Sequence, residues 1–150
     1  MLPASRAALS ALALFAMTSA AAPADLPEIA DTPSAALATC DENDTACGYE
    51  AEGVASYYAR MLHGRLTATG EPYNHGALTA AHRTLPLGSL VEVTNTANGR
   101  AIIVRVNDRG PFVRGRLIDL SGATADALDF RRAGVADVRV RYLGRAAPRV

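Results

Sequence analysis

The chain contains no lysine and no tryptophan, and all 15 of its basic residues are arginines. Arginine forms two-point hydrogen bonds with carboxylates and can line a groove that holds an anionic polymer. Solvated side chains on the surface of a globular domain are the simpler explanation for most of these arginines. With a formal net charge of zero and none of the known nucleic-acid-binding motifs, the sequence does not predict a nucleic-acid ligand.

Long hydrophobic runs are also missing. The apolar stretch at 7–17 is shorter than the roughly 20 residues that cross a bilayer. It follows Arg6 and precedes small residues at 18–22, which is the layout of a cleavable secretory signal. The sequence therefore predicts a signal peptide at 1–22 and a periplasmic or secreted product. Because no cysteine lies at the cleavage region, no lipid anchor in the membrane is expected.

Cysteine is scarce, with only Cys40 and Cys47 present. In an exported chain, two cysteines this close favour a small disulfide loop. The loop-entropy model gives such a loop at most about 2.5 kcal/mol. Two free thiols or half of a metal site are the alternatives, but no further Cys or His lies nearby to complete a site. The three histidines, His63, His75 and His82, lack metal-ligand spacing, so neither a metal nor a cofactor is predicted.

Charge and composition divide the chain into parts. Residues 24–50 carry acidic side chains and no basic one, and residues 23–39 have too few large apolar groups to offset the entropy of ordering. We predict a disordered acidic linker at 23–50 that contains the cysteine loop, a folded domain at 51–144 and a tail at 145–150. A chain of 150 residues leaves no room for a second domain.

The folded part is predicted to be mainly β, because short apolar runs alternate there with Gly, Pro and Asn. The dipeptide Asn98-Gly99 predicts a tight hairpin turn. Ser121 before the residues 123–130 predicts a short helix with a serine N-cap, which Gly134 breaks. Six strands are expected, at 54–58, 78–81, 90–94, 101–106, 117–120 and 138–143.

Three titratable side chains stand at three separate turns. Asp108 follows a β-branched run and precedes a Gly-Pro turn, Glu71 stands between a glycine and a proline, and His82 lies within 78–86. A carboxylate where a strand enters a loop can act as a general acid, although an Asn-Asp pair at a turn also commonly caps the backbone. A lone Glu at a turn is ordinarily a surface charge, and a half-buried His often bonds a main-chain carbonyl.

These three segments, together with Gly-Val-Ala-Ser-Tyr-Tyr at 53–58 and Gly-Arg-Leu-Ile-Asp-Leu-Ser at 115–121, resemble the rare lipoprotein A family. The resemblance runs from about residue 53 to about residue 142. It implies a six-stranded double-psi β-barrel with one or two short helices that acts on bacterial cell-wall glycan. It matches Asp108 to the family's acid/base, with Glu71 and His82 as its partners. Whether His82 orients Asp108 or polarises the sugar is left open.

Aromatic and basic residues near these turns are candidates for substrate binding. Tyr57, Tyr58 and Tyr73 can stack on sugar rings, although tyrosines near a barrel end more often pack in the core or the rim. Arg83 and Arg109 can each bind a peptide-stem carboxylate or an acidic sugar substituent through two hydrogen bonds. Equally, each can neutralise a neighbouring carboxylate.

The resemblance implies a lytic transglycosylase, which cleaves the β-1,4 bond between N-acetylmuramic acid and N-acetylglucosamine and leaves a 1,6-anhydromuramyl end. A non-catalytic, expansin-like module that binds peptidoglycan or loosens the wall is the alternative. An inverting hydrolase is a third candidate if Glu71 lies about 6.5 to 9.5 Å from Asp108. The expected partner of this monomer is the glycan strand of peptidoglycan, and the sequence names no protein partner at the division site.

Overall fold

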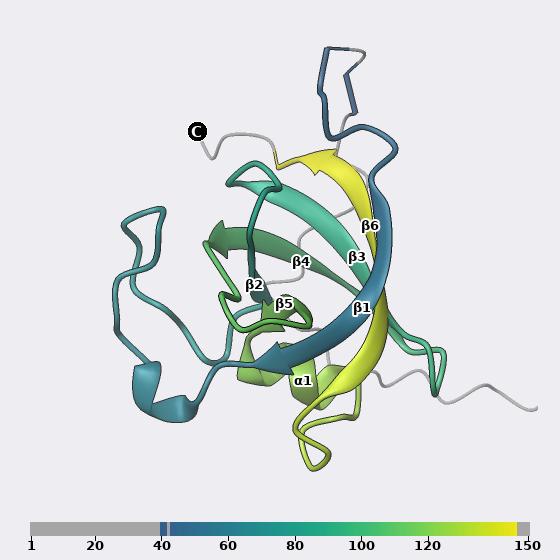
Figure 1. Ribbon diagram of the computed structural model, residues 1–150. Helices are drawn as coiled ribbons and strands as arrows, with labels where there is room; N and C mark the ends of the chain where they lie inside the picture. Colours follow the sequence, from purple (N-terminus) through teal and green to yellow (C-terminus); the bar gives the residue numbers. More distant parts are fainter. Residues whose placement is uncertain (1–39, 42, 147–150) are drawn as a thin grey trace, which may run out of the picture.

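The computed structural model describes residues 40–41 and 43–146 (Figure 1). The predicted signal peptide, the linker up to residue 39 and most of the predicted tail lie outside the described residues. Six strands close into one barrel in the order β1-β5-β2-β4-β3-β6, which confirms the predicted mainly β, six-stranded fold. Their bounds are β1 Glu50–Tyr57, β2 Thr79–His82, β3 Ser89–Asn95, β4 Ala101–Asp108, β5 Arg116–Leu120 and β6 Ala136–Arg145.

The first strand starts earlier than the sequence pattern predicts. β1 begins at Glu50 rather than at residue 54, because it pairs antiparallel with β6 along its first six residues. Arg139 of β6 donates to Glu52 at 2.9 Å and lies 3.6 Å from Glu50. Glu50 and Glu52 therefore lie on the solvent-facing side of a strand.

The barrel core is made by alternate side chains of the strands. Every second residue along a strand points inward, and each large aliphatic side chain buried this way contributes about 1.5–3 kcal/mol. The core members that are fully shielded from solvent include Val91, Val93, Val104, Val106, Ile118, Leu120, Val138 and Val140.

A short helix lies beside the barrel. Helix α1 (Gly122–Ala127) follows Ser121, whose side chain accepts a hydrogen bond from the backbone N–H of Thr124, as the predicted N-cap requires. The carbonyl of Leu128 at its C-terminal end accepts from the side-chain amides of Asn95 and Asn98, each at 3.0 Å. These two hydrogen bonds thus join the β3–β4 hairpin to the end of helix α1.

Two connections gather at one side of the barrel. The long connection 58–78, which contains the short 3₁₀ turn η2 (Arg60–Leu62), joins β1 to β2 and stands off the barrel in Figure 1. The connection 109–115 leaves the end of β4. The register places Ser56, Asp119, Ala81 and Asp108 in one row across β1, β5, β2 and β4. The ends of β1 and β4, far apart in sequence, therefore lie on the same side.

The segment before β1 is fastened to the barrel. Cys40 and Cys47 form a disulfide with a Cα–Cα distance of 5.8 Å. Within this loop Asp44 accepts a hydrogen bond from the Tyr142 hydroxyl of β6. None of the helices in the described part of the chain is long and apolar enough to cross a membrane.

Candidate active site

A pocket of about 270 Å³ opens where the two connections meet. Asp108 and Arg109 contribute to it from the end of β4, and the connection 58–78 contributes the other lining residues, which are Tyr58, Leu62, Arg65, Leu66 and Tyr73. Its mixture of aromatic, aliphatic and charged groups around one carboxylate is the composition of a small-molecule site.

Asp108 is half-buried and fixed by three donors. Its Oδ1 accepts from the backbone N–H groups of Ala68 at 2.9 Å and Arg109 at 2.8 Å. Its Oδ2 accepts from the Tyr58 hydroxyl at 3.0 Å. A carboxylate oxygen has two lone pairs, so Oδ2 keeps one for a ligand in the pocket. The carboxylate is thus held in one orientation with capacity to bind a further proton or donor.

Two tyrosines pack together beside this carboxylate. The ring centroids of Tyr58 and Tyr73 lie 5.1 Å apart at a tilt of 56°. Burial, followed by the negative charge of Asp108, raises the pKa of Tyr58, so this hydroxyl stays protonated and donates. Tyr73 is 4% exposed, and its hydroxyl accepts from the backbone N–H of Gly122 at 3.3 Å. Tyr73 therefore joins the connection 58–78 to the start of α1.

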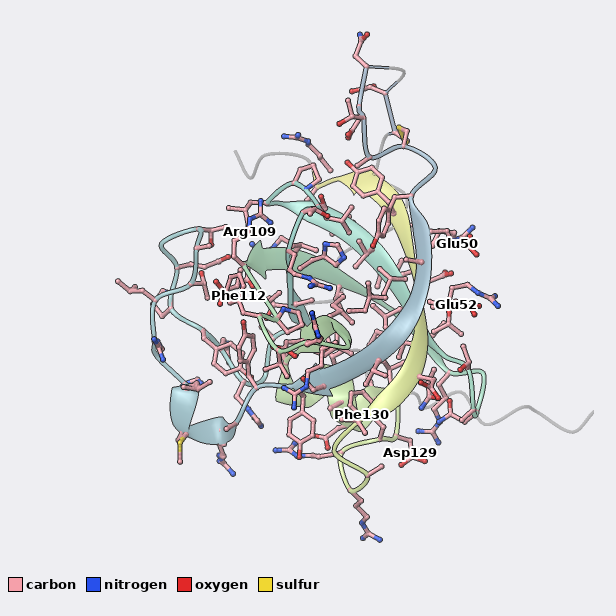
Figure 2. All side chains as sticks on the ribbon, in the orientation of Figure 1. Glu50, Glu52, Arg109, Phe112, Asp129 and Phe130 are labelled. Atoms are coloured by element: carbon pink, nitrogen blue, oxygen red, sulfur yellow. A yellow bond between two sulfur atoms is a disulfide. The ribbon has the colours of Figure 1, made fainter. Side chains whose placement is uncertain are left out.

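Tyr57 lies elsewhere. Its hydroxyl donates to the carbonyl of Arg131 at 3.1 Å, and its ring meets the edge of Phe130. Figure 2 shows Phe130 below the end of β1, well away from Arg109. Because neighbouring residues at a strand end point to opposite sides, Tyr58 reaches the pocket and Tyr57 does not line it.

Glu71 lies in the 67–71 turn, which donates a hydrogen bond to Asp108, and it does not line the pocket. Arg105 donates to its two oxygens at 2.6 and 3.0 Å, and this hydrogen bonding lowers the pKa of Glu71 to about 2. The backbone carbonyl of Glu71 also accepts from the N–H and the hydroxyl of Thr67. The same turn carries Ala68, whose N–H reaches Asp108. Glu71 and Arg105 therefore brace the turn.

His82 is enclosed, with 3% of its surface exposed. Its Nδ1 accepts from the backbone N–H groups of Thr84 at 3.3 Å and Leu85 at 3.1 Å, which places the ring proton on Nε2, 3.1 Å from the Tyr49 hydroxyl. Burial and then the charges of Arg83 and Arg109 lower the pKa of His82 to about 4. The imidazole is therefore neutral near pH 7.

Arg109 connects the His82 segment to the pocket. Its guanidinium donates to the carbonyls of His82 at 3.1 Å and Leu85 at 2.7 Å, while its backbone N–H donates to Asp108. Arg83 is exposed, donates to the carbonyl of Arg116 at 3.1 Å, and is not among the pocket-lining residues. Of the eight catalytic and substrate-binding residues predicted from the sequence, the structure brings Asp108, Tyr58, Tyr73 and Arg109 together in the pocket.

The family model described as "Lytic transglycolase" matches residues 50–140. The chain belongs to this lytic transglycolase family. The double-psi β-barrel that the resemblance implied is thereby confirmed.

Curated relatives carry matching names. A Nostoc protein named "Probable endolytic peptidoglycan transglycosylase RlpA" is 57% identical over 96 residues, which are 63% of this chain and 26% of that protein. A Campylobacter jejuni protein named "Endolytic peptidoglycan transglycosylase RlpA" is 50% identical over 99 residues, 66% of this chain and 36% of that protein. The chain thus spans about a quarter to a third of the length of these relatives.

Solved structures include an apo expansin from Clavibacter michiganensis. It is 18% identical with a TM-score of 0.53, and the match covers 67% of this chain and 53% of the expansin. At this level of identity the similarity concerns the fold alone.

Five residues at the site of this lytic transglycolase domain were not predicted from the sequence, namely Leu62, Arg65 and Leu66 of the pocket lining, Arg105 beside Glu71 and Tyr49 beside His82. Arg105 occupies the polar position between two buried valines of β4, a signal that a partner was needed. Tyr49 of the segment before β1 and Arg65 of the pocket gave no such signal. Arg65 forms no salt bridge to a carboxylate within the described residues. The same part of the chain holds no cluster of three His, Cys, Asp or Glu side chains able to bind a metal.

Proposed function

We propose that this domain is an endolytic peptidoglycan transglycosylase that cleaves the β-1,4 bond between N-acetylmuramic acid and N-acetylglucosamine. The observation that carries the proposal is Asp108, the one carboxylate among the described pocket-lining residues, held by three donors in a pocket with aromatic and aliphatic walls. The printed names of the curated relatives support the same reaction. Peptidoglycan lies outside the cytoplasmic membrane, so the proposal includes an extracytoplasmic site of action.

In the proposed reaction Asp108 acts twice. As an acid it transfers its proton to the glycosidic oxygen, so that the bond from the muramyl C1 to this oxygen breaks and the N-acetylglucosamine hydroxyl leaves. As a base the carboxylate then takes the proton of the muramyl 6-hydroxyl, whose oxygen bonds to C1 and closes the 1,6-anhydro ring. The proton returns to Asp108 and no water is consumed. A single carboxylate suffices, unlike the pair used by ordinary glycosidases.

The other two members of the predicted triad are assigned positioning roles. Glu71 acts through Arg105 and the 67–71 turn, and its bidentate ion pair makes it a poor second base, which argues against an inverting hydrolase. His82 acts through the carbonyl that holds Arg109. Its enclosure favours orientation of the site over direct polarisation of a sugar. A displacement of about 1 Å in such a support can cost on the order of 100-fold in rate.

Product analysis tests the proposal. Purified sacculi are digested with the full chain in H₂¹⁸O, and the released fragments are analysed by mass spectrometry. We expect 1,6-anhydromuramyl ends without ¹⁸O, and none with Asp108→Asn. The matched control is Asp137→Asn, which changes an exposed carboxylate on β6.

Three other results would each replace the proposal. Reducing ends that carry ¹⁸O would indicate a hydrolase. Full activity of Asp108→Asn would remove Asp108 from the mechanism. Binding to sacculi without any released product would assign the alternative of a non-catalytic glycan-binding module.

A further inference from the structure

Most of the exposed large apolar side chains lie in the two connections, 58–78 and 109–115, that meet at the Asp108 pocket. The described residues include five large apolar side chains that are strongly exposed. Met61 and Leu66 lie in the connection 58–78, and Phe112 and Val113 lie in the connection 109–115, so four of the five belong to the two connections that meet at the pocket, and Leu66 lines it. Single exposed apolar residues are ordinary, but a group confined to the loops around a site marks a contact surface.

Phe112 stands out within this group. It is 83% exposed, although phenylalanine is among the residues most often buried. Its ring lies back over Gly110, because a Cβ placed on Gly110 would be 3.7 Å from its Cε2 and 3.8 Å from its Cδ2. Figure 2 shows Phe112 close to Arg109, between the end of β4 and the connection 58–78. One edge of the ring therefore lies near Gly110, and most of the ring surface is open to solvent.

The tyrosines predicted to stack on sugars do not offer such a surface. Tyr58 and Tyr73 pack against each other at a tilt, and Tyr73 is almost fully buried. Tyr57 packs against Phe130 and lies outside the pocket lining. Among the described aromatic side chains, Phe112 alone falls in the exposed class. The electron-rich face of an aromatic ring attracts the slightly positive C–H groups on one face of a pyranose.

We propose that Phe112 is the platform on which a sugar ring of the glycan strand stacks, adjacent to the ring whose glycosidic bond lies at Asp108. The ring is on the chain segment that carries the acid, so a stacked sugar fixes the position of the neighbouring linkage relative to Asp108. Phe112 is then a specificity-determining residue for flat, pyranose-based polymers. The inference rests on the proposed function in taking peptidoglycan glycan as the ligand.

Binding without turnover tests the platform. The parent protein is the full chain with Asp108→Asn, and the probe is purified sacculi pelleted with increasing protein. We expect Phe112→Ala to raise the apparent Kd about tenfold and Phe112→Trp to keep or improve parental binding. Phe112→Leu, which is apolar but not flat, should bind as weakly as the alanine variant. Val135→Ala, at the fifth exposed apolar position, should leave the apparent Kd unchanged.

Two checks keep the result interpretable. Because Phe112 is so exposed, its replacement should not change the thermal unfolding midpoint, which confirms that each variant is folded. Parental binding by Phe112→Ala, equal binding by Phe112→Leu and Phe112→Trp, or a parent that does not pellet with sacculi would each overturn the platform. Anhydro products together with Phe112-independent binding reject the platform alone. Phe112-dependent binding without anhydro products rejects the transglycosylase and keeps the platform.

Discussion

Two hollows of equal size on this molecule each contain an aspartate that accepts a hydrogen bond from a tyrosine hydroxyl. Both have a volume of about 270 Å³. In one, Tyr58 of the connection after β1 donates to Asp108 of β4. In the other, Tyr142 of β6 donates to Asp44 of the disulfide loop. The pair of residue types is the same, so the difference between the two regions lies in what surrounds the pair.

The bonds of Asp44 fasten a loop. One oxygen caps the N–H of Ala46 within the same loop, and the other lies 3.8 Å from the guanidinium of Arg145. Its hydrogen bond from Tyr142 lowers the pKa of Asp44. The residues that line this hollow are all polar or charged, and none of them is aromatic or aliphatic. The region serves to attach the segment before β1 to the barrel.

Asp108 has different neighbours. The adjacent residue in the chain, Arg109, directs its guanidinium to the carbonyls of His82 and Leu85. Aromatic and aliphatic side chains line the hollow. The comparison teaches that a carboxylate with a tyrosine donor becomes a candidate acid only where its cation is directed to other acceptors and its surroundings are partly apolar.

The largest expected effect compares the two aspartates directly. Asp108→Asn should lower the release of anhydro products from sacculi by about 10² to 10⁴, the usual contribution of a general acid/base. Asp44→Asn should leave this rate within about twofold, because Asp44 contacts no part of the pocket. Rates are measured by chromatography of soluble fragments. Equal losses in the two variants would erase the functional difference between the regions.

The second-largest expected effect is on stability, whose dependence on pH should differ between His82, beside the Asp108 pocket, and Asp44. The lowered pKa of His82 means that the unfolded chain binds its proton more tightly, so stability present above pH 6.5 is lost as the pH falls toward about 4. The loss amounts to at most about 3 kcal/mol. Asp44, whose pKa is lowered below the ordinary value of 3.8, contributes stability that is lost only as the pH falls below that value.

Urea unfolding at pH 7, 6 and 5 measures this effect before the carboxylates titrate. The free energy of unfolding should fall with pH more steeply for the wild type than for His82→Gln. His75, whose pKa is lowered by burial, adds a slope of the same sign to both proteins. Parallel curves for the two proteins would show that the enclosed imidazole does not control acid stability.

The ion pair between Glu71 and Arg105, which supports the turn beside Asp108, predicts a smaller loss of rate. Glu71→Gln weakens the bidentate pair with Arg105 and should lower the rate on sacculi about tenfold, since the 67–71 turn that donates to Asp108 loosens. The matched control is Glu92→Gln, which removes the pair between Glu92 and Arg141 on the outer face of β3 and β6. Both pairs are partly exposed, so each should cost no more than roughly 1 kcal/mol of stability. A rate loss in both variants would indicate general destabilisation.

The smallest effects are expected when the hydroxyl of Tyr58 or of Tyr142 is removed. Tyr58→Phe should lower the rate about fivefold, because Asp108 loses one of three donors while the ring remains in place. Tyr142→Phe should leave the rate unchanged and lower the free energy of unfolding by about 1 kcal/mol. Steady-state rates and urea denaturation of both variants give the comparison. If Tyr142→Phe lowered the rate as much, the disulfide loop would belong to the site.

Much of the fold was predictable because its signals are local. Each of the six predicted strands overlaps an observed one, and the Ser121 cap occurs where its residue type requires. The β3–β4 hairpin forms, but the predicted two-residue turn at Asn98-Gly99 is wrong: the turn lies at 96–98, and the N–H of Gly99 closes it on the carbonyl of Asn95. The strand ends were less predictable. β1 gains four residues at its start through pairing with β6, and the ion pairs of Arg139 with Glu50 and Glu52 form only once the two strands are side by side.

The site was predictable in part. Asp108 could be found because a β-branched run that stops at an Asn-Asp pair and a Gly-Pro turn marks a strand end on its own. The partner of Glu71 could not be predicted, because Arg105 lies 34 residues away in the sequence and contacts Glu71 only in the folded barrel. The enclosure of His82 likewise depends on Tyr49 and on the turn at Thr84 and Leu85.

The order of residues alone determined where strands run, where they turn, and that an acid stands at the end of β4, because periodicity and turn chemistry act between near neighbours in the chain. Only the tertiary structure decided that Tyr58 and not Tyr57 reaches this acid, that Arg109 is directed to backbone carbonyls, and that Phe112 presents an open ring. Those outcomes are set by packing between segments that the barrel brings together.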